Sequence, residues 1–578
     1  MQQRARELAV PGATRRPAFG LSDVAVFLGA ITLLALVAKV GSGAFVAFVP
    51  QHAVPAVSLD PRNLPYYAGR STLRMFIALA ASFVFTFAYG YAAARSRYAE
   101  RVLIPLLDIL QSVPVLGFLS ITVTGFIALF PGSLLGLEAA SIFAIFTAQA
   151  WNMAFSFYQS LRTLPADLDE ATTAYGLSHW ERFVRLEVPA GMIGLVWNAM
   201  MSFGGGWFFL AASEAISVLN ASYTLPGIGS YVAAAVSAKD MPALGWAVLT
   251  MAVVIFTVDQ LFWRPLVAWS DKFRLEQSAS ASPPQSWVYD LLRGSRITNA
   301  LAALWTQVID GVNGVLSSLT SVRRARPPAR SSDRVERLYN LTLLVIIAAL
   351  LAIGVRFIFL SVGFAEVGKV AFLGLLTALR VAGLLVVATV VWTPIGVAIG
   401  FNPKLAQVLQ PLALFLASFP ANFIFPFATL AFIQYQIPIN FGSMLLMALG
   451  AQWYILFNSI AGAQSIPTDL REMAADIGLT GRQRWQRLII PGIFSSWVTG
   501  GITASGGAWN ASIVSEVVTW GNSTLTAAGL GAYIAGATTA GDWPRITLGV
   551  GMMSLYVVGV NRIFWRRLYA LAERKYHL

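Results

Sequence analysis

The residues of this chain whose types and spacing could do chemistry are concentrated in one polar stretch, ADLDEATTAYGLSHWERFVRLEVPA, at 166–190. Only 12% of the protein is charged, yet this stretch holds seven charged side chains. They are Asp167, Asp169, Glu170, Glu181, Arg182, Arg185 and Glu187. Long apolar segments lie on either side. Such a polar, helix-forming segment can either be a solvated connection or bind a partner. Which of the two applies depends on the helices on either side of it.

Residue types that catalysis requires are scarce. The chain has no cysteine and three histidines, His52, His179 and His577, and no HExxH pattern occurs. Metal catalysis therefore has no candidate ligand set. No GxxxxGK[ST] segment occurs either, so the chain does not bind ATP in the manner of P-loop proteins. We expect a non-enzymatic protein that binds no cofactor of its own.

The composition is that of a membrane protein. Of the 578 residues 57% are hydrophobic, and the mean hydropathy is +0.67. Apolar runs such as 72–94 and 341–364 are long enough to cross a hydrocarbon layer of roughly 30 Å as helices. Strands of alternating polarity, which outer-membrane barrels need, are missing. The net charge of +13 is explained by Lys and Arg retained on the cytoplasmic side, without invoking nucleic acid.

The chain also repeats itself. A second polar stretch, DLREMAADIGLTGRQRWQRLIIPG, lies at 469–492. Identical residues 302 positions apart include Glu170 with Glu472, Gly176 with Gly478 and Pro189 with Pro491. Earlier in each half the separation is 306, as for Arg74 and Arg380, which indicates a four-residue difference near 130–145. The simplest explanation is two homologous halves in one chain.

The apolar runs predict six spans per half, about twelve in all, arranged as parallel halves about a pseudo-twofold axis. In the first half they are about 22–49, 72–94, 103–131, 134–158, 191–216 and 242–268. In the second they are about 338–363, 369–400, 405–433, 438–462, 493–518 and 543–568. The predicted domains are a first transmembrane half at 1–270, a cytoplasmic linker with an amphipathic helix at 271–337, and a second transmembrane half at 338–578.

Charge sets the expected orientation. With the N-terminus inside, the short inner connections carry eleven Lys and Arg residues and the outer ones four. The positive-inside rule then places both termini and both polar stretches on the cytoplasmic side. The expected location is the cytoplasmic membrane of a bacterial or archaeal cell.

Each polar stretch is expected to form two short helices at an angle. A proline (Pro165, Pro467) precedes an acidic first turn, Gly176 or Gly478 permits a sharp change of direction, and a second amphipathic helix is stopped by Pro189 or Pro491. A solvated connection would be free to drift in length. The shared register instead favours a rigid docking element.

These residues resemble the EAA loop of binding-protein-dependent ABC importer permeases. The first copy reads Glu-Ala-Thr with Gly six positions on and Leu-x-Val-Pro at its end, and the second reads Glu-Met-Ala, Gly and Leu-x-Ile-Pro. Ala-Ala-Ser-Glu-Ala around Glu214, Leu-Pro-Gly-Ile-Gly at 225–229 and Trp-Arg at 263–264 resemble the nitrate, sulfonate and taurine branch. The resemblance covers nearly the whole chain outside the linker.

The resemblance implies partners. Two copies of a separate cytoplasmic ATPase, which binds ATP and Mg²⁺, would dock on the two stretches, and an external solute-binding protein would deliver a small anion. The implied docking residues are Glu170, Ala171, Gly176 and Pro189 in the first copy and Glu472, Ala474, Gly478 and Pro491 in the second.

Polar residues within the spans are candidates for the translocation pathway. They are Ser112, Gln149, Asn198, Ser202 and Trp207 in the first half and Ser418, Gln452, Ser505, Trp509 and Asn510 in the second. Ser112 and Ser418 precede prolines that would kink their helices, and the others either line a pore or tie helices together. Arg74 and Arg380 are expected to snorkel to the interface, and Glu214 and Glu516 to have a structural or gating role.

Two other classes compete with this interpretation. An ion-gradient-driven secondary transporter can also contain parallel repeats, but it would need no paired docking loops. An intramembrane enzyme would need a catalytic constellation that the chain lacks. The sequence does not separate nitrate, sulfonate, bicarbonate, another small anion or a cation as cargo.

Overall fold

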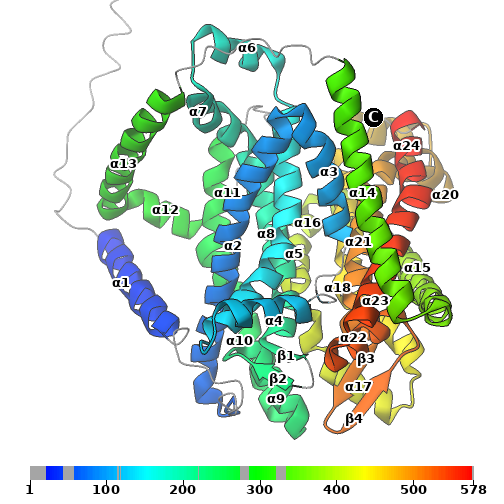
Figure 1. Cartoon of the computed structure of the whole chain (residues 1–578). Helices are drawn as coiled ribbons and strands as arrows, with labels where there is room; N and C mark the ends of the chain where they lie inside the picture. The colour runs from blue at the N-terminus through cyan, green and yellow to red at the C-terminus, as the bar shows by residue number, and fades with distance from the viewer. Residues whose placement is uncertain are drawn as a thin grey trace, which may run out of the picture. The chain divides into compact units, whose positions relative to one another are not determined.

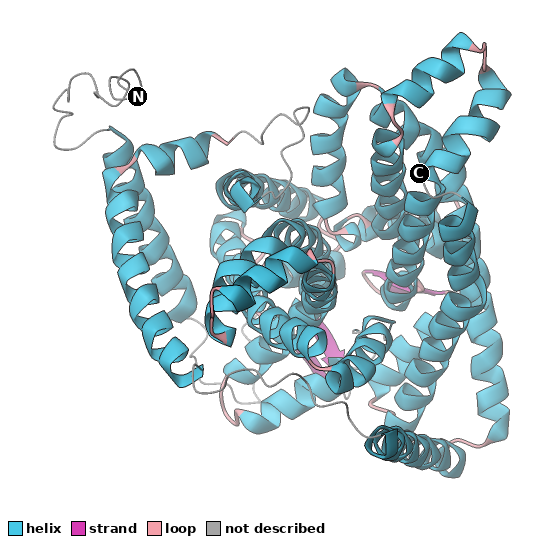
Figure 2. Cartoon of the chain, turned by 90° about the horizontal axis from the view of Figure 1, so that it is seen from above, coloured by secondary structure: helices cyan, strands magenta, loops and turns pink. Residues whose placement is uncertain are grey.

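The computed structural model describes residues 21–42, 57–112, 116, 119–218, 221–273, 286–320 and 333–575. These residues are almost entirely helical, and in Figure 2 the strands are confined to two short hairpins. They divide into two compact units. Unit 1 comprises 1–42, 160–197 and 257–329, and unit 2 comprises 43–159, 198–256 and 330–578.

The first half and the linker form the elements labelled α1 to α13 in Figure 1. Their bounds are α1 Leu21–Ser42, α2 Leu64–Arg95, α3 Arg97–Ser112, α4 Leu119–Leu129, α5 Leu135–Arg162, α6 Ala166–Ala174, α7 His179–Arg182, α8 Val188–Glu214, β1 Ala215–Val218, β2 Ala221–Thr224, α9 Ile228–Ala238, α10 Met241–Val258, α11 Arg264–Ser270, α12 Trp287–Gly294 and α13 Arg296–Thr320.

The second half repeats this order. Its elements are α14 Asp333–Ser361, α15 Phe364–Phe401, α16 Pro403–Ser418, α17 Phe425–Gln434, α18 Ile439–Ser465, α19 Thr468–Asp476, α20 Gly481–Arg484, α21 Ile490–Ser515, β3 Val517–Trp520, β4 Ser523–Thr526, α22 Leu530–Ala540, α23 Trp543–Val560 and α24 Arg566–Lys575. The starts of α6 and α19 differ by 302 residues (468 − 166) and those of α3 and α16 by 306 (403 − 97). The repeat seen in the sequence is therefore also a repeat of structure.

Among the described residues, nine helices are long and apolar enough to cross a membrane. They are Ser22–Ser42, Pro61–Arg95, His179–Glu214, Met241–Phe273, Arg337–Ser361, Phe364–Phe401, Ile439–Ser465, Gly481–Ser515 and Trp543–Ala572. The predicted spans 103–131 and 405–433 are not single helices. In the second of these, α16 ends at Ser418 because Pro420 disfavours helical conformation at the residue before it, and a short 3₁₀ turn then leads into α17. The count of twelve stays a prediction.

The helix after each polar stretch was expected to stop at its proline, and that expectation is wrong. Helix α7 runs through a π turn at Phe183–Glu187 into α8, and α20 does the same through Trp485–Ile489 into α21. In each copy the residue before the proline donates its N–H to a carbonyl five positions back. We attribute the tolerance of Pro189 and Pro491 to this wider turn, which moves the preceding carbonyls out of the usual register.

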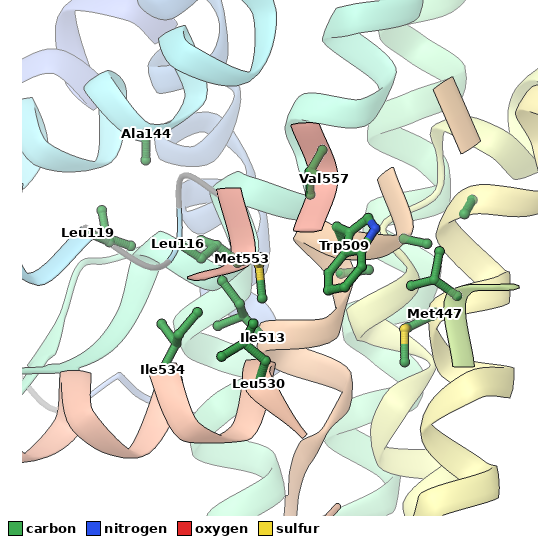
Figure 3. Close-up of a cluster of buried hydrophobic side chains, with 14 of the residues drawn as sticks. Leu116, Leu119, Ala144, Met447, Trp509, Ile513, Leu530, Ile534, Met553 and Val557 are labelled. Carbon is green, nitrogen blue, oxygen red and sulfur yellow. The ribbon is translucent and has the colours of Figure 1, made fainter. Parts of the chain in front are cut away.

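The core of unit 2 contains side chains from both halves. Leu116, Leu119 and Ala144 belong to one buried apolar cluster with Trp509, Ile513 and Met553 (Figure 3). The Trp509 indole also stacks on Tyr556, with ring centroids 5.9 Å apart. Because these side chains are almost fully excluded from solvent, the two halves are held together by apolar packing as well as by covalent continuity.

In unit 1 the described part of the linker, 286–320, forms a pair of helices. Gly294 ends α12, and α13 continues through Gly311 and Gly314. The carboxylate of Asp23 in α1 accepts hydrogen bonds from the Ser295 hydroxyl at 2.8 Å and the Arg296 N–H at 2.6 Å. Asp23 thereby supplies an N-terminal cap to α13 from a distant part of the chain.

Replacing Asp23 by Ala is expected to loosen the start of α13. Loss of an N-cap side chain costs about 1 kcal/mol, so amide hydrogen exchange at Arg296 and Ile297 should accelerate several-fold. The matched control is Asp310→Ala, which removes an exposed carboxylate from the same helix. Equal exchange in the two variants would contradict the capping role.

Candidate functional site

The first docking segment, Ala166–Pro189, has a defined local structure within unit 1. Helix α6 ends before Gly176, whose φ of +67° is a left-handed conformation that favours glycine. Ser178 and Glu181 then form a reciprocal capping box that starts α7. The Trp180 indole N–H donates to the Asn313 side chain at 2.7 Å, so the linker helix α13 supports this segment. Glu170 on α6 is exposed.

The second docking segment, Thr468–Pro491, lies in unit 2 and repeats the turn. Gly478 has a φ of +71°, and Glu472 is exposed while Ala474 is buried. The residue before each turn glycine has a large hydrophobic side chain that is exposed to solvent. Tyr175 is 84% exposed and Ile477 is 64% exposed, and they are 302 residues apart (477 − 175). Exposed apolar groups at equivalent positions are what a repeated partner contact requires.

The first half contains a buried ion cluster that the sequence did not reveal. The Arg74 guanidinium lies 2.5 Å from a Glu138 oxygen and 2.6 Å from a Glu214 oxygen. Arg70 forms a further ion pair with Glu138. The Ser71 hydroxyl and the Gly229 N–H also donate to Glu214, at 2.6 Å and 2.7 Å. The cluster therefore ties α2 to α5, α8 and α9.

The second half builds the same cluster with fewer charges. Arg380 pairs with Glu516 at 2.7 Å, and the Thr377 hydroxyl donates to Glu516 at 2.8 Å. Two further bonds from Arg380 go to the backbone and side-chain oxygens of Asn440. Leu376 stands at the position of Arg70 (70 + 306), and Asn440 at that of Glu138 (138 + 302). The second half therefore lacks both the positive charge of Arg70 and the negative charge of Glu138. In each cluster the charges of the side chains sum to zero.

The expectation that Arg74 and Arg380 snorkel to the interface is therefore wrong. Side-chain exposure is 2% for Arg74 and 10% for Arg380, because each guanidinium neutralises a buried glutamate. Glu214 and Glu516 were expected to have a structural or gating role, and the structure pairs each of them with an arginine. In both halves a glycine, Gly227 or Gly529, lies against the carboxylate where a larger residue would clash.

The pathway candidates of the first half lie in unit 2. Asn198 donates to Ser156 at 3.0 Å, and Ser202 accepts from Asn152 at 3.4 Å. The Trp207 ring packs edge-on against Phe203 and is buried. Gln149 is fully buried. Ser112 is the last residue of α3.

Of the second-half candidates, Ser505 and Trp509 are buried, and Ser418, Gln452 and Asn510 are partly buried. Gln452 accepts a hydrogen bond from the Trp392 indole at 3.0 Å, and Asn510 donates to the Gly506 carbonyl at 3.3 Å. Ser505 is buried on α21 near Trp509. The Ser418 hydroxyl reaches Gly204 of α8, so that α16 of one half touches α8 of the other. Gln452 therefore forms a hydrogen bond between two helices, whereas Ser418 lies where the two halves meet.

Tyr454 is a site residue that the sequence reasoning missed. A methyl group on Gly205 would lie 3.9 Å from its hydroxyl, and one on Gly507 would lie 3.4 Å from its ring. Gly205 and Gly507 are equivalent positions of the two halves (507 − 205 = 302). Tyr454 therefore sits between matching turns of α8 and α21. Its counterpart in the first half is Asn152, and this loss of symmetry was the available signal.

The fold and these sites define a multi-pass helical membrane protein with two repeated halves, each with one exposed helix–glycine–helix segment. Residues 84–262 and 392–575 each match the family described as the binding-protein-dependent transport system inner membrane component. The two matches cover more than half of the chain, and the chain belongs to this family. It is a duplicated ABC importer permease of the inner membrane, a non-catalytic subunit.

Individual relatives are distant. The chain is 29% identical over 139 residues to the bicarbonate transport system permease protein CmpB of Synechococcus elongatus, covering 24% of this chain and 49% of CmpB. It is 25% identical over 184 residues to the nitrate import permease protein NrtB of Leptolyngbya laminosa, covering 32% of this chain and 62% of NrtB. A putative ABC transporter permease of Methanocaldococcus jannaschii is 27% identical over 146 residues, 25% of this chain and 53% of that protein. The chain thus spans about half the length of the curated relatives it matches.

Proposed function

We propose that this chain forms the complete translocation pathway of an ABC importer for a small anion, with permease halves at 1–270 and 338–578 joined by a cytoplasmic linker at 271–337. The observation that carries the proposal is the pair of docking segments. Each has a left-handed glycine after a short helix, an exposed apolar side chain before that glycine, and a π turn into the next span.

Two copies of a separate ATPase dock on these segments in our proposal. Glu170, Ala171 and Gly176 form the first contact, with Glu472, Ala474 and Gly478 at the second. The helix after each glycine continues past Pro189 or Pro491 into α8 or α21, so a displacement of the segment is carried into a span. Closure of an ATP-bound dimer would then rock the halves and alternate access to the pathway. ATP and Mg²⁺ bind to the ATPase partner.

The proposed cargo is a small anion delivered by an external solute-binding protein. This assignment is supported by two relatives, a bicarbonate transport permease and a nitrate import permease. With both termini in the cytoplasm, the hairpins β1–β2 and β3–β4 and the helices α9 and α22 face the binding protein. This orientation follows from the distribution of Lys and Arg.

Reconstitution separates the importer from a gradient-driven secondary transporter. Vesicles that contain this chain alone are expected to take up no nitrate or hydrogencarbonate, with or without a proton or sodium gradient. Uptake should appear when the ATPase is present with ATP trapped inside and the binding protein is supplied outside. Isotope-labelled anion retained on filters gives the measurement. Gradient-driven uptake by the chain alone would refute the ATPase-coupled mechanism.

A further inference from the structure

The glycine triplet Gly204–Gly206 of α8 lies against neutral polar side chains and the thioether of Met75. A methyl group on Gly204 would lie 2.8 Å from the Ser418 hydroxyl, and one on Gly206 would lie 3.0 Å from Nε2 of Gln149. The Tyr454 hydroxyl faces Gly205 between them. These groups come from α5, α16 and α18, so both halves contribute side chains to the surroundings of the glycine triplet.

Gln149 is the observation that points to a ligand. Its side chain is fully buried, and in the part of the chain that the structure describes neither its amide oxygen nor its amide nitrogen has a hydrogen-bond partner. Buried polar groups are nearly always paired, because an unpaired one forfeits its hydration. An amide with both ends unpaired by protein groups, lying against Gly206 of α8, is available to form hydrogen bonds with a ligand.

The charge of the site follows from the ion clusters. The arginines Arg70, Arg74 and Arg380 each form an ion pair with a glutamate. The side chains at the triplet are an amide, two hydroxyls and a thioether, and all are neutral. Removing an ion from water costs free energy that rises with the square of its charge. Neutral donors can offset this cost for a monovalent anion far better than for a dianion.

We propose that Gln149, Tyr454 and Ser418 form the cargo-contact site of the pathway, and that it selects monovalent oxoanions over dianions with neutral hydrogen-bond donors. This inference rests on the proposed importer function. Gly205 lies beside the Tyr454 hydroxyl, and Gly206 lies beside the Gln149 amide and the Met75 thioether.

The test uses the complex purified from its source membrane through a tag on this chain and reconstituted with ATP. Nitrate, hydrogencarbonate and sulfate are the probes. The wild-type complex is expected to import the first two and to discriminate against sulfate by at least a hundredfold in kcat/KM. Gln149→Leu should lower kcat/KM for the monovalent anions roughly tenfold or more, the loss of a hydrogen bond to a charged ligand. Gln149→Glu, which adds a negative charge of nearly the same shape, should lower it further.

Stability separates a binding role from a structural one. Because Gln149→Leu removes an unpaired buried amide, its melting temperature should equal or exceed that of the wild type while transport falls. The control is Gln159→Leu, the same change at an exposed position of α5, which should leave transport unchanged.

Each outcome bears on one claim. If the wild-type complex imports neither monovalent anion with ATP, the proposed function fails. If it imports them but Gln149→Leu, Gln149→Glu and Tyr454→Phe all transport normally, or if sulfate is imported as well as nitrate, the cargo-contact site is refuted while the importer function stands.

Discussion

A permease that carries Gly176→Asp and Gly478→Asp together is expected to lose its ATPase partners and its ATP-driven uptake. Among the described residues, and apart from the glycine and its chain neighbours, no atom lies within 4 Å of a methyl group placed on Gly176 or Gly478, so the new side chains project into space that a partner would occupy. Each also strains a backbone at a φ of +67° or +71°. A carboxylate buried unpaired in each contact should reduce uptake by on the order of a hundredfold or more.

Co-purification of the ATPase with tagged permease, scored with uptake in the same membranes, gives the measurement. Gly294→Asp is the matched control, because it adds the same carboxylate at an open, exposed glycine of the linker. Expression and melting temperature should be similar in all three proteins. Normal recovery of the ATPase with the double variant would show that the partner docks elsewhere.

The docking segments were largely predictable because their signals are local. A glycine at a fixed distance from an acidic turn specifies a left-handed corner, and both corners are present. The π turns were not predictable, since proline in a helical pattern ordinarily predicts a stop. Only the register of carbonyls before Pro189 and Pro491 decides between a stop and a wider turn, and that register is set by packing.

The ion clusters show where single-sequence reasoning fails. Arg74 and Glu138 are 64 residues apart, and Arg74 and Glu214 are 140 apart, so no local pattern joins them. An arginine near a helix end is usually solvated by snorkelling, which made exposure the natural expectation. The repeat did contain a usable signal: the halves differ by a cation at Arg70 and an anion at Glu138, which only a contact explains economically.

The second large effect is expected when Arg70 and Glu138 are replaced by the residues at the equivalent positions of the second half, Leu376 and Asn440. Glu138→Asn alone leaves the buried Arg70 guanidinium without its carboxylate, and Arg70→Leu alone leaves Glu138 with one cation fewer. Breaking a buried ion pair by removing one partner costs about 3–5 kcal/mol. Either single variant should therefore fold poorly and show a markedly lower melting temperature in detergent.

The double variant Arg70→Leu with Glu138→Asn is expected to recover most of the loss. It reproduces the arrangement of Leu376 and Asn440, in which an arginine binds the asparagine backbone and side-chain oxygens at 3.0 Å and 2.8 Å. The cluster keeps the pair of Arg74 with Glu214 and stays neutral. A double-mutant cycle on melting temperature and folded yield should give a coupling of about 2–3 kcal/mol between the two changes. Additive losses would mean that Arg70 and Glu138 act independently, and that charge balance does not govern how the two halves diverged.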